Sequence, residues 1–455
     1  MNRVARRAAV VLLLAMVLLG GFAFFVAEFA VKAHAWVLFP GSPHVYYAGN
    51  IGSGVAVDRE NTLLLNMQEG RVYSSDEQIR SATVHWVGDR NGSVSAPALP
   101  SHSKEIAGFT LWNGLYHYGN AASVSTLTLS ARLQKVALQA LGDKKGTVAV
   151  YNYKTGELLC AVTTPTYDPD NIPDLSLDTE GKFEGMYLNR FTQATYTPGS
   201  IFKIVTLAAA LETIPDVQQQ SFTCSASYTL PGGIVTCETA HGQQTLEQSF
   251  VNSCNCAFAQ LSQQLGADTL AQYAEKFGLT ESVRFDGIAT ARGSFQKAPT
   301  ESEVAWSAIG QYKDLVNPCS FLTFVGAVAG GGKGTVPYVV SSVERGGSRE
   351  YTAQTVQTEL MLSEETAKLL REYMHQCTLL KYGAENFPGL TVCAKTGTAQ
   401  LDNKASTAML TGFVTEEAYP LAFIVCVEEG GYGRATCVPI ASQVLSACKA
   451  VLDAG

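Results

Sequence analysis

The sequence has few charged residues and no basic patch beyond its first residues. Asp, Glu, Lys and Arg make up 16% of the 455 residues, and the net charge is −8. A protein that binds nucleic acid needs a positive surface to meet the phosphates, and no motif that reads RNA or DNA is present. The composition therefore excludes nucleic acid as an expected partner. Its 46% of hydrophobic residues predicts a globular protein with a large core.

Histidine is scarce, and its seven copies form no pair at the spacing of helical metal ligands. Cysteines number eleven, but no spacing among them is typical of a zinc site. The sequence therefore predicts no metal site and no cofactor. Cys224 and Cys237 flank the turn-like Pro231-Gly232-Gly233 and could form a disulfide, although sequence alone does not determine which cysteines pair.

The N-terminus carries a long hydrophobic run. Three arginines precede an uncharged stretch from Ala8 to Ala27, whose length matches the hydrocarbon core of a bilayer. Positive charge on the short side predicts a cytoplasmic N-terminus and an extracytoplasmic remainder. The alternative is a cleaved signal peptide, with Ala33-His34-Ala35 as its cleavage site. The apolar run is longer than a signal-peptide core, so we expect a retained single-pass anchor in the cell membrane.

Turns and strand patterns divide the remaining chain. Residues 40–120 are rich in Gly, Ser and Asn, which predicts a small domain of short strands. From residue 146 onward, the hydrophobic pattern predicts five strands: Gly146–Tyr151, Glu157–Thr164, Leu390–Thr398, Ala408–Val414 and Leu421–Val427. Helical patterns dominate the stretch between them, and a helix over 438–451 follows. This order predicts an α+β fold with one mostly antiparallel sheet and an inserted helical lobe.

The first candidate site is Ser200-Ile201-Phe202-Lys203. Thr197-Pro198-Gly199 predicts a turn before it, and the apolar residues after it predict a buried helix that begins at Ser200. Residues three apart share a helical face, which places Lys203 beside the Ser200 hydroxyl. The neighbouring sequence carries no other charge, and burial favours the neutral amine that a general base requires. The structural alternative is an N-cap serine with a lysine that reaches solvent.

Two further short motifs are weaker when each is taken alone. In Ser253-Cys254-Asn255 the hydroxyl could relay a proton and the amide could hold a substrate amide, although Ser and Asn are ordinary loop residues. In Lys395-Thr396-Gly397-Thr398 the lysine and the two hydroxyls could bind a carboxylate, and the glycine would let an extended substrate approach. Its structural alternative is an edge strand protected by a charge.

Together, the three motifs occur in the order found in penicillin-binding proteins and β-lactamases. The chain resembles a class B penicillin-binding protein, the monofunctional D,D-transpeptidase type, from about Thr126 to the C-terminus. Three further segments are similar to the family: Thr155-Gly156-Glu157-Leu158-Leu159, Ile309-Gly310-Gln311 and Lys395-Thr396-Gly397-Thr398-Ala399-Gln400.

The resemblance implies a transpeptidase fold and acyl transfer on the stem peptides of peptidoglycan. Ser200 would attack the penultimate D-Ala carbonyl, an amine of a neighbouring peptide would take the acyl group, and β-lactams would acylate the same serine. Lys203 would be the base and Ser253 a proton relay. The substrate-binding residues would be Asn255, Lys395, Thr396, Gly397 and Thr398. The backbone N–H groups of Ser200 and Thr398 would form the oxyanion hole.

The resemblance also implies an organisation of the chain. The expected parts are a cytoplasmic tail (1–7), a transmembrane anchor (8–31), an N-terminal pedestal (40–120) and the transpeptidase domain (125–455). A membrane glycan polymerase or another wall-synthesis protein is the expected partner, in division or in the maintenance of cell shape.

Two alternatives remain open from the sequence. One is a β-lactamase or β-lactam sensor with the same motifs, although no Glu-bearing loop for deacylation and no second cytoplasmic domain are evident. The other is a non-catalytic scaffold of a wall-synthesis complex, against which the intact Ser200, Lys203 and Lys395 argue.

Overall fold

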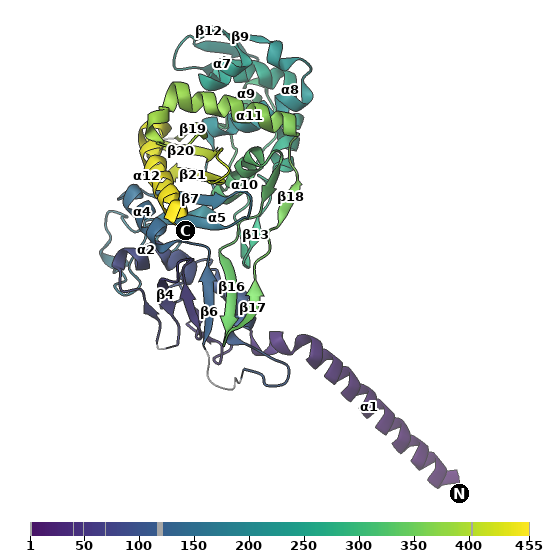
Figure 1. The fold of residues 1–455 in the computed structure, drawn as a ribbon. Helices are drawn as coiled ribbons and strands as arrows, with labels where there is room; N and C mark the ends of the chain where they lie inside the picture. Colours follow the sequence, from purple (N-terminus) through teal and green to yellow (C-terminus); the bar gives the residue numbers. More distant parts are fainter. Residues whose placement is uncertain are drawn as a thin grey trace.

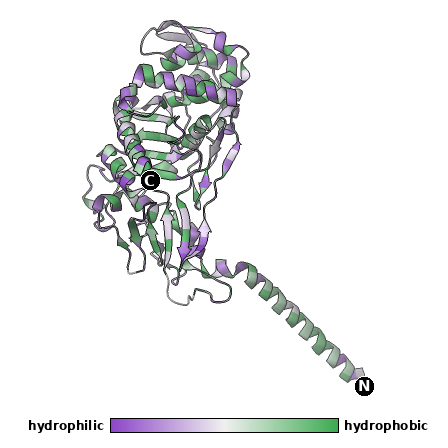
Figure 2. Ribbon diagram, viewed as in Figure 1, coloured by the Kyte–Doolittle hydropathy of each residue, from purple (hydrophilic) through white to green (hydrophobic). Residues whose placement is uncertain are grey.

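The N-terminal hydrophobic run forms one long helix. The computed structural model describes residues 2–39, 41–48, 50–68, 70–115, 122–401 and 404–454. Helix α1 (Asn2–Val37) projects from the body of the protein and is hydrophobic along most of its length (Figures 1 and 2). Its apolar side chains are exposed; Leu18, for example, is 75% exposed. A surface of this kind and length belongs in hydrocarbon, so the protein is anchored in a membrane, as predicted.

A six-stranded sheet lies next to the anchor, in the order β17-β16-β6-β3-β4-β5. Four of its strands come from the N-terminal part: β3 (Val55–Val57), β4 (Leu63–Asn66), β5 (Val72–Tyr73) and β6 (Ser123–Leu127). The other two form a hairpin from much later in the chain: β16 (Val340–Arg345) and β17 (Ser348–Thr352). Leu127 of β6 pairs with Val340 of β16. Residues from the predicted transpeptidase part therefore complete the N-terminal sheet.

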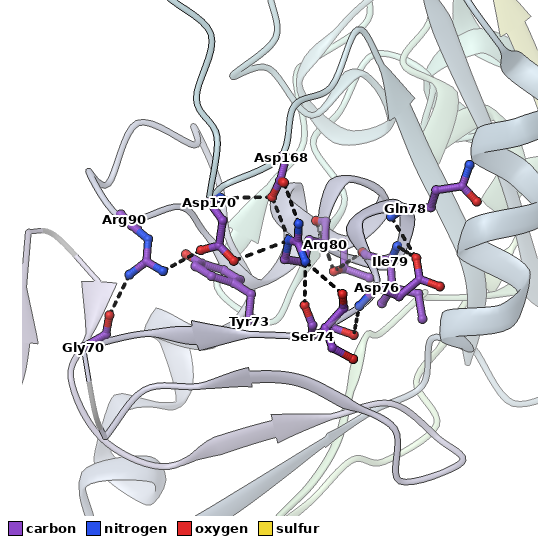
Figure 3. A network of polar contacts seen from close by, with 12 residues as sticks. Gly70, Tyr73, Ser74, Asp76, Gln78, Ile79, Arg80, Arg90, Asp168 and Asp170 are labelled. Carbon is purple, nitrogen blue, oxygen red and sulfur yellow. Dashed lines mark hydrogen bonds and ion pairs between the residues drawn. The ribbon is translucent and has the colours of Figure 1, made fainter.

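Helix α2 (Glu77–Val87) ties this sheet to the loop after strand β8 (Leu158–Thr164) (Figure 3). Arg80 on α2 forms a bidentate ion pair with Asp168, with Nε–Oδ1 and Nη2–Oδ2 distances of 2.7 and 2.6 Å. The guanidinium also donates to the carbonyl oxygens of Ser74 and Ser75. The two charged side chains are only 15% and 11% exposed. The hydrogen bond from Arg80 holds the pKa of the Asp168 carboxyl below its usual value.

Replacing Arg80 with Ala is expected to lower the free energy of unfolding by about 1.5–3 kcal/mol, the usual range for hydrogen bonds to charged groups. The substitution leaves the largely buried Asp168 carboxylate without its partner. The shift in the urea midpoint of the purified protein measures the effect. Arg292→Ala is the matched control, because Arg292 pairs with Glu281 at a 63% exposed site. A control change within about 0.5 kcal/mol is expected, and equal losses in both variants would contradict the prediction.

A five-stranded antiparallel sheet forms the centre of the second part, in the order β19-β20-β21-β7-β8. Its strands are β7 (Gly146–Asn152), β8 (Leu158–Thr164), β19 (Val392–Leu401), β20 (Lys404–Val414) and β21 (Leu421–Val427). Every residue of β8 and β21 is buried, which requires cover on both faces. The covering helices include α4 (Ala131–Leu141), α10 (Pro318–Ala329) and α12 (Gly433–Ala454) (Figure 1). Although α12 is long and apolar, it packs on the sheet as a core helix.

The chain between β8 and β19 builds a helical lobe at the end of the molecule away from α1 (Figure 1). Its main helices are α6 (Lys203–Thr213), α7 (Leu246–Val251), α8 (Asn255–Lys276), α9 (Glu301–Ala308) and α11 (Glu364–Cys377). Thr245 and Gln248 form a capping box at the start of α7. The predicted fold, an antiparallel sheet with an inserted helical lobe, is confirmed.

Candidate active site

Ser200 lies in a tight turn that touches the edge strand of the five-stranded sheet. A short 3-10 segment, Gly199–Phe202, leads directly into α6. Gly199 has a φ of +55°, and a Cβ at this position would lie 2.8 Å from the carbonyl oxygen of Thr398. Because a side chain here would collide with β19, glycine lets the turn that carries Ser200 sit against this strand. Gly397 allows the same close approach from the strand, since a Cβ at this position would lie 2.8 Å from the Pro198 carbonyl oxygen.

Lys203 is fully buried and reaches Ser200. Its Nζ lies 3.1 Å from Ser200 Oγ, 2.6 Å from the carbonyl oxygen of Ser253 and 2.7 Å from Asn255 Oδ1. A neutral lysine amine has two N–H groups and one lone pair, and both of the shorter contacts are to oxygens that only accept. These two contacts use both N–H groups, which leaves the lone pair for the Ser200 hydroxyl.

Both lysines of the site are shifted toward their neutral forms. Burial lowers the pKa of Lys203 to about 7, and the positive charge of Lys395 acts in the same direction. Burial also lowers the pKa of Lys395 to about 8. Near neutral pH, Lys203 therefore carries a neutral amine in a substantial fraction of the protein molecules.

Ser253 lies between the two lysines. It occupies the turn between α7 and α8 with a φ of +51°, which is unfavourable for a serine and common where a site requires a particular side-chain direction. Its Oγ is 2.9 Å from Lys395 Nζ and 3.2 Å from Lys203 Nζ. Asn255 Nδ2 donates to the carbonyl oxygen of Thr236 at 2.9 Å, while its Oδ1 accepts a hydrogen bond from Lys203 Nζ. A continuous polar chain thus joins Lys203, Ser253 and Lys395.

The free edge of β19 faces the site. On an edge strand, the N–H and C=O of every second residue point away from the neighbouring strand. The Thr398 carbonyl oxygen accepts from Gln311 Nε2 at 3.0 Å, and the Gln400 N–H donates to Gln311 Oε1 at 3.3 Å. The Thr398 N–H therefore also points to the free edge, toward the turn that holds Ser200. The Gln311 side chain bridges this edge as a strand neighbour would.

A cleft of about 930 Å³ opens above these residues. Ser200, Ser253, Asn255, Thr396 and Thr398 line it. Lys203 and Lys395 lie buried beneath them, and Gly397 forms the contact between strand and turn. All eight site residues predicted from the sequence are thus brought together.

Tyr382 is a neighbour of the site that the sequence analysis missed. It ends the short π-helical segment Thr378–Tyr382, and its buried hydroxyl accepts from the Thr396 N–H at 2.9 Å. The same hydroxyl lies 3.1 Å from Thr396 Oγ1. The tyrosine therefore holds the strand that carries Lys395 and Thr396. No sequence motif surrounds it, so only the fold reveals this contact.

A second missed feature is a group of potential metal ligands. Cys224, Cys237, His241 and Cys254 bring their sulfur and nitrogen atoms within 4.8 Å of one another. Cys224 and Cys237, which the sequence suggested as a disulfide, are free thiols, as are the other cysteines. These four side chains are spread over 31 residues of sequence (224–254), at intervals that match no common zinc motif.

A serine in a 3-10 turn and a buried lysine at the start of the helix that follows, beside the edge strand of an antiparallel sheet, define a serine-type acyltransferase. Residues 146–446 match the family described as penicillin binding protein transpeptidase domain. The chain belongs to this family, which confirms the predicted family, fold and class of enzyme.

Individual relatives agree with this assignment. Peptidoglycan D,D-transpeptidase PbpA of Mycobacterium tuberculosis is 28% identical over 351 residues, which cover 70% of this chain and 71% of the relative. The ceftriaxone acyl-enzyme complex of penicillin-binding protein A from M. tuberculosis has a TM-score of 0.77 at 24% identity, covering 87% of this chain and 98% of that one. A chain of a peptidoglycan synthase complex that coordinates polymerization and crosslinking has a TM-score of 0.63 at 25% identity, over 72% and 63% of the two chains.

Proposed function

We propose that this protein is a peptidoglycan D,D-transpeptidase in which Ser200 is the nucleophile and Lys203 its general base. The observation that supports these roles best is the environment of Lys203 Nζ. Two acceptor oxygens use its N–H groups, and Ser200 Oγ lies 3.1 Å away, within reach of the lone pair. A base within hydrogen-bonding distance of a hydroxyl and with a pKa near neutrality meets both requirements of general base catalysis.

In the proposed reaction, the Ser200 hydroxyl gives its proton to Lys203 as Oγ attacks the penultimate D-Ala carbonyl carbon. The N–H groups of Ser200 and Thr398 stabilise the oxyanion that forms. When the C–N bond breaks, Ser253 relays the proton from Lys203 to the departing D-Ala amine. The resulting ester is then attacked by an amine of a second stem peptide, whose proton returns by the same path to Ser200 Oγ.

The substrate roles follow from the free edge of β19. Lys395 and the hydroxyls of Thr396 and Thr398 supply the positive charge and hydrogen bonds for the terminal carboxylate. Gly397 lets the strand lie close enough to Ser200 for the substrate to reach both. Asn255 faces the cleft and is proposed to contact the substrate amide as well as Lys203.

For the chain as a whole, we propose a cytoplasmic tail (1–7), an anchor (8–31), an N-terminal pedestal (40–120) and a transpeptidase domain (125–455). The hairpin β16–β17 would be the part of the last domain that completes the pedestal sheet. The arginines before the anchor support a cytoplasmic N-terminus with catalysis outside. The likeness to a chain of a synthase complex supports a glycan polymerase as partner.

Mass spectrometry of the protein with penicillin G tests this function. A one-to-one adduct that persists for hours is expected, and tryptic digestion should place it on the peptide from Phe191 to Lys203. Rapid release of hydrolysed drug would instead indicate the β-lactamase alternative. The absence of any adduct would indicate the scaffold alternative, and an adduct on another peptide would reject Ser200.

The rate of acylation is expected to depend on pH in a defined way. As pH rises through about 7, Lys203 loses its proton and the rate should increase. As pH rises further through about 8, Lys395 loses its charge and attracts the ligand carboxylate less, so the rate should fall. The charged and titratable groups that face Lys203 are Lys395, Glu238, Cys237 and Cys254. A fluorescent penicillin measures the profile, and a rate independent of pH across this range would contradict the prediction.

A further inference from the structure

Four ligand side chains from separate elements meet at the rim of the active-site cleft. Cys224 ends β9 (Ser221–Cys224), Cys237 follows β11 (Gly233–Thr236), and His241 precedes β12 (Gly242–Thr245). Cys254 is the central residue of the turn between α7 and α8 that also carries Ser253 and Asn255. Cys224 and Cys254 are buried, whereas Cys237 and His241 are partly exposed and line the cleft.

The two distances from the histidine to sulfur match those of a tetrahedral metal site, and all four ligand atoms lie within 4.8 Å of one another. His241 Nδ1 lies 3.5 Å from Cys224 Sγ and 3.6 Å from Cys237 Sγ. With Zn–S bonds of about 2.3 Å and Zn–N bonds of about 2.0–2.1 Å, tetrahedral angles separate sulfur and nitrogen ligands by about 3.5–3.6 Å. A disulfide would use only two of the three cysteines and would give the histidine no role.

The histidine is also oriented as a ligand. Its other ring nitrogen, Nε2, lies 3.5 Å from the hydroxyl of Thr239. With Nε2–H donating to that oxygen, Nδ1 keeps its lone pair toward the sulfurs. A metal-binding histidine typically donates its second ring N–H in this manner, which sets both the tautomer and the ring orientation.

The segment that carries three of the ligands has little core of its own. It consists of two separate two-stranded sheets, β9 with β12 and β10 (Ser227–Leu230) with β11. Most residues of these four strands are at least partly exposed, and the buried ones are Phe222, Cys224, Leu230, Val235 and Gln244. Small units with so little apolar burial commonly depend on a structural metal or disulfide.

We propose that Cys224, Cys237, His241 and Cys254 bind one Zn²⁺ ion, which fixes the turn Ser253-Cys254-Asn255 beside the nucleophile. The three thiols release their protons to solvent on binding, the imidazole stays neutral, and no electron is transferred. Four protein ligands close the coordination shell, so the site is structural and binds no substrate.

The zinc site bears on catalysis through Cys254. The two short hydrogen bonds of Lys203 go to Ser253 and Asn255, the residues on either side of this ligand. Loss of the metal should therefore displace the acceptors that orient the Lys203 amine. This consequence rests on the proposed function, whereas metal binding itself does not.

Metal analysis of the full-length protein tests the site. Protein produced with Zn²⁺ in the medium and purified under reducing conditions without chelator should hold one zinc per chain. Replacing the zinc with Co²⁺ should produce the intense visible absorption of tetrahedral thiolate-bound cobalt. Cys237→Ser and His241→Ala should lower the zinc content well below one. Cys448→Ala is the control, because Cys448 is a buried free thiol on α12, outside the group, and it should keep the full content.

Activity is a second, separable measurement. Stripping the zinc should slow acylation by penicillin G about 10–100-fold, as a misplaced catalytic group does, and returning Zn²⁺ should restore the rate. Ser200→Ala should keep its zinc while it loses acylation, which separates failure of the proposed function from failure of the metal site. A protein without zinc in which Cys224 and Cys237 form a disulfide would overturn the proposal. Unchanged zinc in both ligand variants, or another metal in its place, would also overturn it.

Discussion

Ser200→Ala is expected to abolish the covalent penicillin adduct completely. The variant lacks the hydroxyl oxygen that forms the ester in the proposed mechanism, and Lys203 next to it keeps its hydrogen bonds to Ser253 and Asn255. Alanine fits the turn without strain, since only one oxygen is lost and Gly199 still supplies the close approach to β19. Intact mass after a long incubation with penicillin G measures the outcome.

The matched control for this experiment is Ser348→Ala, a serine at an exposed position of β17. This variant should acquire the same adduct as the unmodified protein, at the same rate. Both variants should unfold at the same urea concentration as the parent. An adduct on folded Ser200→Ala protein would show that another residue is the nucleophile.

Lys203→Met is expected to slow acylation by about 10²–10⁴-fold, the usual contribution of a general base. Methionine has nearly the same length and tolerates burial, so the loss of the amine is the main change. The carbonyl oxygen of Ser253 and Asn255 Oδ1 both lose their donor, which adds a penalty in stability. The second-order rate constant with a fluorescent penicillin measures the first effect, and the urea midpoint measures the second.

The pH profile distinguishes a base from a structural lysine. In Lys203→Met the residual rate should no longer rise as pH passes through about 7, because the group that titrates there has been removed. Lys297→Met serves as the control, since Lys297 is largely exposed and pairs with Asp268 at the surface. A Lys203→Met protein that keeps the rising limb of the profile would contradict the assignment of Lys203 as base.

Local sequence patterns were sufficient for the three motifs and for the central sheet. Ser200 and Lys203 are three residues apart in a 3-10 turn that continues into α6, and Lys395 to Thr398 lie on one strand, so each motif's geometry follows from its own segment. The strands predicted over 390–427 differ from the observed ones mainly at their ends.

Features that depend on distant parts of the chain were not predictable in this way. Tyr382 supports Thr396 from a segment with no motif, and only the packing of that segment on β19 brings them together. The four zinc ligands proposed here occur at 224, 237, 241 and 254, and the β9–β12 unit must fold before they meet. Pairing of β6 with β16 depends likewise on contacts between remote strands, for which local hydrophobic patterns carry no information.

The pairing of Leu127 with Val340 also constrains how the protein can be made. During synthesis, β3 to β6 emerge early, but β6 has no neighbour on its outer side until residues 340–352 have been made. An unpaired strand edge of this kind is prone to join other chains. The N-terminal sheet therefore cannot be completed until residue 352 has been made, although its first strands are among the earliest to be synthesised.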